Sequence, residues 1–297
     1  MATLEELKDK IATAQDLQSV VKTMKALAAV SIRQYEKAVE SLTQYNRTLE
    51  MGLQILLQQK PETLLPKKPY SVKPQGIIIF GSDWGMCGQF NERITNYLAK
   101  NLTNGSIHPQ VPLILAIGTR ICDRLNTVGY PTEACFNLPS SVGGITSVVE
   151  EIVLILQQWR QEKHIEEIFV VYNQITNGIT YNPTELQIFP LNSTWLRRLQ
   201  KQPWQSKSLP TFTMPEQQLA AALFRQYFFV SLYRACAESL KSENTSRLAA
   251  MQMAEKNITE RLEQLDIDFN QQRQTTITEE LLDIVAGFEA LTQPKKE

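Results

Sequence analysis

The stretch whose residue types come closest to a chemical site is the glycine-bounded segment Gly81-Ser-Asp-Trp-Gly85-Met-Cys-Gly88, which follows a run of apolar residues. A turn between a strand and a helix can bind phosphate through its backbone N–H groups. Here the glycine spacing matches neither the dinucleotide-binding pattern nor the P-loop, and no lysine follows directly. Cys87 has no histidine or second acid placed beside it as a base. A structural turn is therefore the favoured interpretation, and a nucleotide or phosphate site is the open alternative.

The other candidate residues have plainer explanations. Glu279 and Glu280 are adjacent on a predicted helix and are better explained as surface or partner contacts than as a catalytic pair. Met251 and Met253 are better explained as packing residues. The sequence therefore predicts no catalytic residue, no metal site and no cofactor. Its four cysteines lack metal or redox spacing, so we expect buried, reduced thiols at all of them: Cys87, Cys122, Cys135 and Cys236.

The two ends of the chain must form long helices. Residues 216–286 contain no Pro or Gly, and a helix of that length extends about 100 Å. Residues 2–51 also lack both breakers. In each segment apolar residues recur at spacings near three and four, the pattern of a helix that packs on another helix. We therefore expect an antiparallel coiled coil of the terminal helices, with a domain inserted between them.

The middle of the chain has a different period. After a proline-rich linker, short apolar runs at 76–80, 111–118, 134–138, 166–174 and 184–191 alternate with helical stretches at 87–102, 119–129 and 147–163. This alternation predicts a parallel, Rossmann-like sheet, and residues 192–215 are expected to be a return loop. The predicted fold class is α/β with a long coiled coil. The expected parts are a first helix at 1–60, a Rossmann-like domain at 68–195 and a last helix at 212–291.

Charge and hydropathy limit the possible partners. The 297 residues carry a net charge of -1, which argues against a nucleic-acid binder. No stretch approaches 18 apolar residues and the start lacks a signal pattern, so we expect contact with a membrane only through another protein. Lys22, Lys25 and Arg33 lie in an acid-free stretch, whereas residues 243–291 hold ten acids and four bases. Either the two helices have opposite charge, or a basic collar faces an acidic partner.

Three stretches carry a resemblance to the γ subunit of F-type rotary ATP synthases, the central shaft of that motor. Residues 10–34 are similar to the first helix of the family. FGSDWGMCGQFN at 80–91 is similar to its S-D-x-G-L-C-G-x-x-N loop, with Trp84 and Met86 as departures. Residues 246–291 are similar to its specific C-terminal pattern, and the resemblance covers nearly the whole chain.

The resemblance implies a shaft that stands in a ring of three α and three β subunits, with the ε subunit and the membrane c-ring as further partners. Nucleotide sites would belong to α and β, and the chain would lie peripherally on the cytoplasmic face of a bacterial plasma or thylakoid membrane. It implies β-subunit contacts at Lys22, Met24, Lys25, Arg33, Arg247, Gln274 and Thr278. It also implies an apolar bearing tip formed by Leu281, Leu282, Ile284, Val285 and Phe288.

The chain departs from photosynthetic members of the family, because it shows neither their mid-domain insertion nor a regulatory cysteine pair. Thiol regulation is therefore not expected. Asp16, Leu17 and Val20 replace common family residues and indicate a divergent or alternative F-type enzyme, driven by protons or sodium ions. Two other functions remain open: a coiled-coil tether or scaffold without a motor role, and an enzyme that uses the Gly81–Gly88 loop.

Overall fold

The computed structural model describes residues 3–59, 74–103, 112–178, 180–204, 207–208 and 210–292. Its contacts fall into two compact units, one within residues 1–27 and 248–297 and the other within residues 28–247. Two helices contribute to both units, α1 (Leu4–Gln59) and α6 (Glu216–Thr292), as the breaker-free ends of the sequence predict. Within the described residues, no helix is long and apolar enough to cross a membrane.

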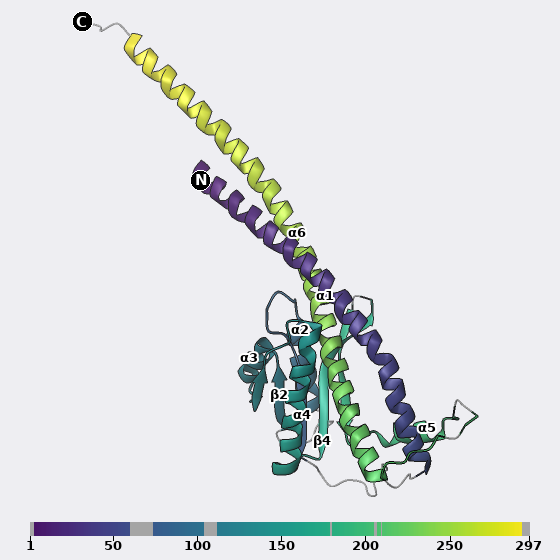
Figure 1. The fold of residues 1–297 in the computed structure, drawn as a ribbon. Coiled ribbons are helices and arrows are strands. Elements are labelled where there is room, and N and C mark those ends of the chain that lie inside the picture. Colours follow the sequence, from purple (N-terminus) through teal and green to yellow (C-terminus); the bar gives the residue numbers. More distant parts are fainter. Residues whose placement is uncertain are drawn as a thin grey trace. The chain divides into compact units, whose positions relative to one another are not determined.

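The unit within 28–247 is built on a five-stranded sheet of order β3-β2-β1-β4-β5. Two of its strands, β2 and β4, are labelled in Figure 1. The strands are β1 (Gln75–Phe80), β2 (Leu113–Ile117), β3 (Ala134–Phe136), β4 (Glu167–Asn177) and β5 (Thr180–Phe189). The pairs β1–β2, β1–β4 and β2–β3 are parallel, as predicted. The four parallel strands β1 to β4 therefore end on the same side of the sheet, and the loops that follow them lie near one another there.

Helices cover both faces of this sheet, which explains why β1 is apolar throughout. Ile77 and Ile79 pack on one face with α2 (Phe90–Thr103) and α3 (Thr119–Val128). Ile78 and Phe80 pack on the other face with α1, α4 (Ile145–Glu162) and α6. Successive side chains of a strand point to opposite faces, so an unbroken apolar run indicates a strand covered on both sides.

The prediction of a wholly parallel sheet is wrong at one strand. β5 pairs antiparallel with β4, starting from Asn177 opposite Thr180. Only residues 178 and 179 separate the two strands, whereas a parallel neighbour needs a crossover of a dozen or more residues. The Asn177-Gly178 dipeptide at the end of β4 was the sequence signal for a hairpin.

The prediction of a loop over residues 192–215 is also wrong in part, because α5 occupies Ser193–Lys201. Asn192 caps this helix, since its Oδ1 accepts hydrogen bonds from the backbone N–H groups of Thr194 and Trp195. Leu196 and Leu199 are buried against the C-terminal end of α1 and the start of α6. The sequence signals for this helix were Asn192 before Ser193 and Thr194 and the spacing of three between Leu196 and Leu199.

Gly52 does not end α1; it allows close helix packing. A Cβ atom at this position would lie 2.8 Å from Leu223 Cδ2 of α6, so a larger residue would force that side chain to move. Glycine at this position therefore permits a close approach of α1 and α6 within the unit of residues 28–247.

The other unit is an antiparallel helix pair. The side chain of Lys25 hydrogen-bonds to Glu255, and that of Gln18 hydrogen-bonds to Thr259. Residue numbers therefore rise along α1 in the direction in which they fall along α6. Leu7, Val21, Met251 and Leu265 are buried in this pair. Beyond Leu265 no described residue of α6 is buried, and Figure 1 shows α6 continuing past the start of α1.

Candidate functional site

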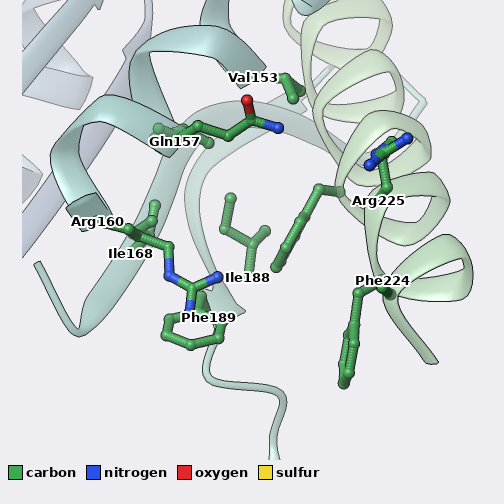
Figure 2. Close-up of a pocket in the computed structure, with 11 residues that line it drawn as sticks. Val153, Gln157, Arg160, Ile168, Ile188, Phe189, Phe224 and Arg225 are labelled. Atoms are coloured by element: carbon green, nitrogen blue, oxygen red, sulfur yellow. The ribbon is translucent and has the colours of Figure 1, made fainter. Parts of the chain in front are cut away.

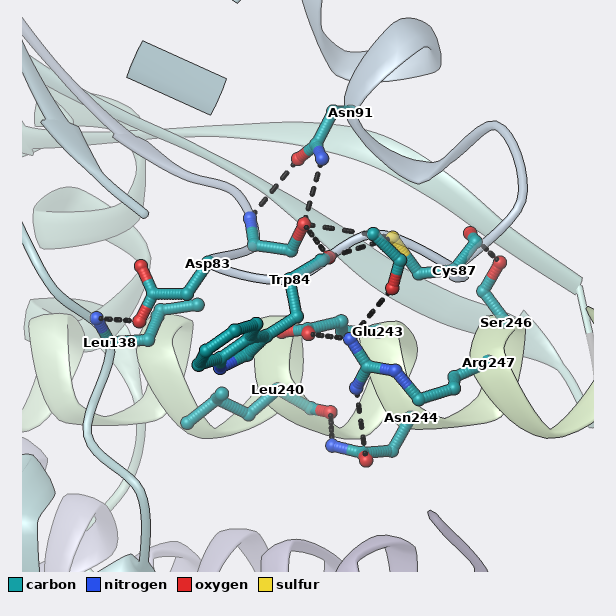
Figure 3. A network of polar contacts seen from close by, with 12 residues as sticks. Asp83, Trp84, Cys87, Asn91, Leu138, Leu240, Glu243, Asn244, Ser246 and Arg247 are labelled. Atoms are coloured by element: carbon teal, nitrogen blue, oxygen red, sulfur yellow. Dashed lines mark hydrogen bonds and ion pairs between the residues drawn. The ribbon is translucent and has the colours of Figure 1, made fainter. Parts of the chain in front are cut away.

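The loop between β1 and α2 is held by a dense set of internal hydrogen bonds (Figure 3). Asn91 Oδ1 accepts from the Ser82 backbone N–H at 3.1 Å, and Asn91 Nδ2 donates to Ser82 Oγ at 2.7 Å. Ser82 Oγ in turn donates to the carbonyl oxygen of Trp84. Gly81 approaches α3 so closely that a Cβ atom would lie 2.2 Å from Ile121 Cβ. The glycine-bounded segment is thus a fixed turn.

Asp83 connects this loop to the start of α3 and to the segment that follows β3. Its Oδ1 accepts from the Thr119 N–H at 2.8 Å, and its Oδ2 accepts from the Leu138 N–H at 2.8 Å. Thr119 begins α3 and Leu138 follows β3, so one carboxylate bridges two segments. Both oxygens therefore serve a structural purpose in this chain.

Two side chains of α6 hold the other end of the loop. Ser246 Oγ donates to the Cys87 carbonyl oxygen at 2.6 Å, and Arg247 Nη2 reaches the Gly85 carbonyl oxygen at 3.5 Å. Arg247 also forms an ion pair of 2.6 Å with Glu243, one turn earlier on the helix. We call residues 81–91 together with 243–247 the loop latch.

The ion pair between Glu243 and Arg247 in the loop latch is largely buried. Glu243 is only 4% exposed, and its Oε2 is buried without a hydrogen-bond partner among the described residues. Burial raises the pKa of Glu243 to about 7; Arg247 opposes this rise and the charge of Asp83 adds to it. Glu243 therefore titrates near neutral pH, where an ordinary surface glutamate stays ionised.

Cys87 is unsuited to nucleophilic chemistry in this setting. Its thiol is buried, and burial raises its pKa above the usual range. The sulfur lies 3.6 Å from Ser82 Oγ and 3.7 Å from the Trp84 carbonyl oxygen. A protonated, buried thiol among hydroxyl and carbonyl groups is a packing residue.

The loop latch also presents two apolar side chains that sequence reasoning treated only as departures from a family pattern. Trp84 is 77% exposed and Met86 is 63% exposed, although both follow a rigid turn. Met86 has a positive φ of 61°, a conformation that the surrounding hydrogen bonds maintain. Large apolar groups held in solvent on a fixed loop are typical of partner contacts.

A hollow of about 350 Å³ lies elsewhere in the same unit, between α4, the strands β4 and β5, and α6 (Figure 2). Most of its lining residues are apolar, and the guanidinium of Arg160 lies over the Phe189 ring at 4.2 Å from the centroid. Among the described residues that line it there is no carboxylate, histidine or cysteine. The hollow therefore lacks an acid–base pair for catalysis.

The predicted β-contact residues differ in their surroundings. Lys25 pairs with Glu255 of the same chain at 2.5 Å, so its charge is compensated internally. Lys22 is exposed and reaches Gln18, and Arg33 is exposed as well. Met24 is half-buried. Lys25 is therefore paired within the chain, whereas Lys22 and Arg33 are exposed.

The predicted contacts on α6 are divided in the same way. Arg247 lies in the loop latch, whereas Gln274 and Thr278 are exposed one turn apart. The Thr278 hydroxyl donates to the Gln274 carbonyl oxygen at 2.8 Å. The predicted tip residues are 48% to 70% exposed: Leu281, Leu282, Ile284, Val285 and Phe288.

The expectation of four reduced, buried thiols is wrong for two of them. Cys87 and Cys236 are free and buried, but Cys122 and Cys135 form a disulfide. They are 13 residues apart in the sequence, and they come together because α3 packs beside β3. Their spacing matches no motif, so only the tertiary fold reveals the pair. In the described part of the chain no three His, Cys, Asp or Glu residues are placed to hold a metal ion.

An α/β domain inserted between two long terminal helices, with an apolar helix end left uncovered, defines the chain as a stalk-type subunit. The family model described as "ATP synthase" matches residues 3–291, so the chain belongs to the ATP synthase family. ATP synthase gamma chains of Buchnera aphidicola and Maridesulfovibrio salexigens are 27% and 26% identical to it. Each of these alignments covers 74% of both chains.

Solved structures support the same fold. A chain of the Euglena gracilis mitochondrial ATP synthase, from a structure of OSCP, F1 and the c-ring, superposes with a TM-score of 0.62 at 16% identity. The match covers 99% of this chain and 98% of that one. A chain of the Tetrahymena thermophila central stalk and c-ring structure gives a TM-score of 0.56 at 18% identity, over 79% and 99% of the two chains.

Proposed function

We propose that this chain is the central rotating shaft of an F-type ATP synthase, which couples ion-driven rotation of the membrane c-ring to ATP synthesis or hydrolysis in the α/β ring. The observation that carries the proposal is the uncovered C-terminal part of α6. Ile284 and Phe288 are 70% and 68% exposed near the end of α6, and among the side chains described beyond Leu265 none is buried. Such a surface needs an apolar partner, and a bearing formed by a surrounding ring supplies one.

The helix pair has the mechanical and chemical asymmetry that a shaft needs. Two packed helices form a stiff rod, and exposed cations lie on α1 while α6 is rich in acids. Each of three surrounding β subunits would meet a different face, so the rod would bias three equivalent sites unequally. We assign the β contacts to Lys22, Met24, Lys25, Arg33, Arg247, Gln274 and Thr278, and the bearing tip to Leu281, Leu282, Ile284, Val285 and Phe288.

In this proposal the chain has no catalytic site of its own, and the nucleotide chemistry belongs to α and β. The loop latch supports this division, because both carboxylate oxygens of Asp83 accept hydrogen bonds from the chain's own backbone. The ε subunit and the c-ring complete the set of partners. The chain would lie peripherally on the cytoplasmic face of a bacterial plasma or thylakoid membrane and reach the membrane through the c-ring.

The decisive experiment is co-expression of the full chain with the α and β subunits of the same source, followed by native mass measurement and an ATPase assay. We expect a complex of three α, three β and one copy of this chain, with ATPase activity that depends on the chain. Ile284→Asp should lower that activity several-fold, because it brings a charge into the proposed bearing. Glu263→Asp, an exposed change on the same helix, is the control and should leave activity unchanged. A chain that stays apart from α and β would instead support the tether.

A further inference from the structure

The apolar hollow between α4, the strands β4 and β5, and α6 has the size and lining of a small-molecule pocket (Figure 2). Its volume of about 350 Å³ falls in the range of ligand pockets, which is about 300–1,000 Å³. Ile168 and Ile188 line it from the sheet and are 2% and 0% exposed. The half-buried rings of Phe224 and Phe228 line it from α6, with centroids 6.5 Å apart. Such a lining suits a flexible hydrocarbon chain.

Two arginines at the edge of the hollow give it a positive charge. Arg160 comes from α4 and Arg225 from α6, and both are exposed. No acidic residue lines the hollow among the described residues, and neither arginine forms an ion pair with a described carboxylate. Glu150 and Glu166 line neighbouring hollows that share Arg225 and Arg160, respectively. An apolar interior with a basic edge is complementary to an amphipathic anion.

Arg160 is held in a position that leaves its hydrogen-bond donors free. Its guanidinium lies 4.2 Å from the centroid of the Phe189 ring, and this contact uses the face of the guanidinium group. The N–H groups lie in the guanidinium plane, and no described oxygen accepts a hydrogen bond from them. A planar fork of this kind matches the two oxygens of a carboxylate. The contact with Phe189 therefore orients Arg160 for an anionic head group at the edge of the hollow.

We propose that this hollow binds a straight-chain fatty carboxylate, with the chain between the sheet and α6 and the carboxylate on Arg160. Arg225 adds positive charge from the opposite helix. A neutral chain would leave both arginines without an anion, and a small anion would leave the apolar lining uncovered, so the two features together select an amphipathic anion. The site goes beyond the proposed shaft function and does not rest on it, because binding is measured on the chain alone and assembly is measured with α and β.

Calorimetric titration of the full chain with octanoate, 1-octanol and acetate tests the site. We expect saturable binding of one octanoate per chain. 1-Octanol should bind about tenfold more weakly, because it lacks the charge-assisted hydrogen bonds to the arginine. Acetate should show no saturable binding, because it has no chain to bury. Absence of saturable octanoate binding would overturn the proposal, and equal affinities for octanoate and 1-octanol would refute the role of the carboxylate.

Arg160→Gln tests the position of the head group. This variant should bind octanoate about tenfold more weakly than the wild type and bind 1-octanol equally well, because only the charged partner of the carboxylate is lost. Arg273→Gln removes an exposed arginine of α6 that does not line the hollow, and it should leave both affinities unchanged. Unchanged octanoate affinity in Arg160→Gln would overturn the assignment. An equal loss for octanoate and 1-octanol would also overturn it, since Arg160 would then only shape the hollow.

Ala221→Phe tests whether the hollow itself holds the chain of the ligand. Ala221 is exposed on α6 and lines the hollow, so a phenyl ring there would occupy the space without removing a buried side chain. We expect saturable binding of octanoate and of 1-octanol to disappear, while the circular dichroism spectrum matches that of the wild type. Undiminished octanoate binding in the folded variant would place the ligand elsewhere and overturn the proposal. If this variant fails to fold, the comparison of Arg160→Gln with Arg273→Gln decides.

Discussion

The two halves of helix α6 differ in which side chains are buried and which are exposed. In the half that packs within residues 28–247, polar groups are buried: Glu238, Ser239, Ser242, Glu243 and Thr245. In the last turns, large apolar groups are exposed, from Leu281 to Phe288. Buried polar groups persist only where partners satisfy them, and exposed apolar groups persist where a partner outside the chain covers them. The first half is thus covered by the chain itself, although one carboxylate oxygen each of Glu238 and Glu243 has no hydrogen-bond partner among the described residues, and the last turns are not covered.

The largest expected effect comes from removing one partner of the buried pair. Arg247→Ala should lower the free energy of unfolding by about 3–5 kcal/mol at pH 8, because Glu243 would lose the cation that stabilises its buried carboxylate and would have to take up a proton or stay charged without compensation. Chemical denaturation monitored by circular dichroism measures the loss. Arg261→Ala, on an exposed turn of the same helix, is the control and should change stability by less than about 0.5 kcal/mol. Equal effects of the two changes would contradict the comparison.

Two leucines of α6, one buried and one exposed, test the difference between the two halves through packing alone. Leu232 is fully buried, so Leu232→Ala should cost about 2–5 kcal/mol. Leu282 is 62% exposed, so Leu282→Ala should change the stability of the isolated chain by less than about 0.5 kcal/mol. Urea denaturation of both variants gives the two values. A large loss with Leu282→Ala would mean that the chain itself covers the tip.

Glu243 should make stability depend on pH. Its pKa rises from 4.5 to about 7 on folding, so the folded state favours the protonated form. Its contribution to stability is therefore complete below about pH 4.5 and is lost as pH rises through 7, at up to about 1.4 kcal/mol per pH unit. Glu243→Gln should flatten this dependence in urea titrations at a series of pH values. Identical slopes in the variant and the wild type would rule out Glu243 as the titrating group.

A small effect is expected for the ion pair that Lys25 forms between the two helices. The pair with Glu255 is partly exposed, and such pairs contribute about 1 kcal/mol or less. Lys25→Ala should therefore lower the melting temperature only slightly, and added salt should reduce the difference between variant and wild type. A loss as large as that of Arg247→Ala would show that the Lys25–Glu255 ion pair is as desolvated as the Arg247–Glu243 ion pair of the loop latch.

Some features followed from the sequence because their causes are local. The absence of Pro and Gly from 216–286 determined a long helix, and the apolar run at 77–80 determined a strand covered on both faces. The resemblance in 80–91 and 246–291 named the family, and the family model confirmed it. The direction of β5 and the existence of α5 also had local signals, the short turn after Asn177 and the cap at Asn192, which the prediction overlooked.

Other features depend on distances between residues far apart in the chain, which a linear pattern does not encode. Only the tertiary structure joined Cys122 to Cys135, placed Asp83 between α3 and β3, and set Arg247 against both Glu243 and the Gly85 carbonyl. The sequence determined which segments are helix and strand, because periodicity and breakers act over a few residues. The fold decided which polar groups are buried, and therefore which of them titrate near neutral pH, because desolvation depends on everything packed around a group.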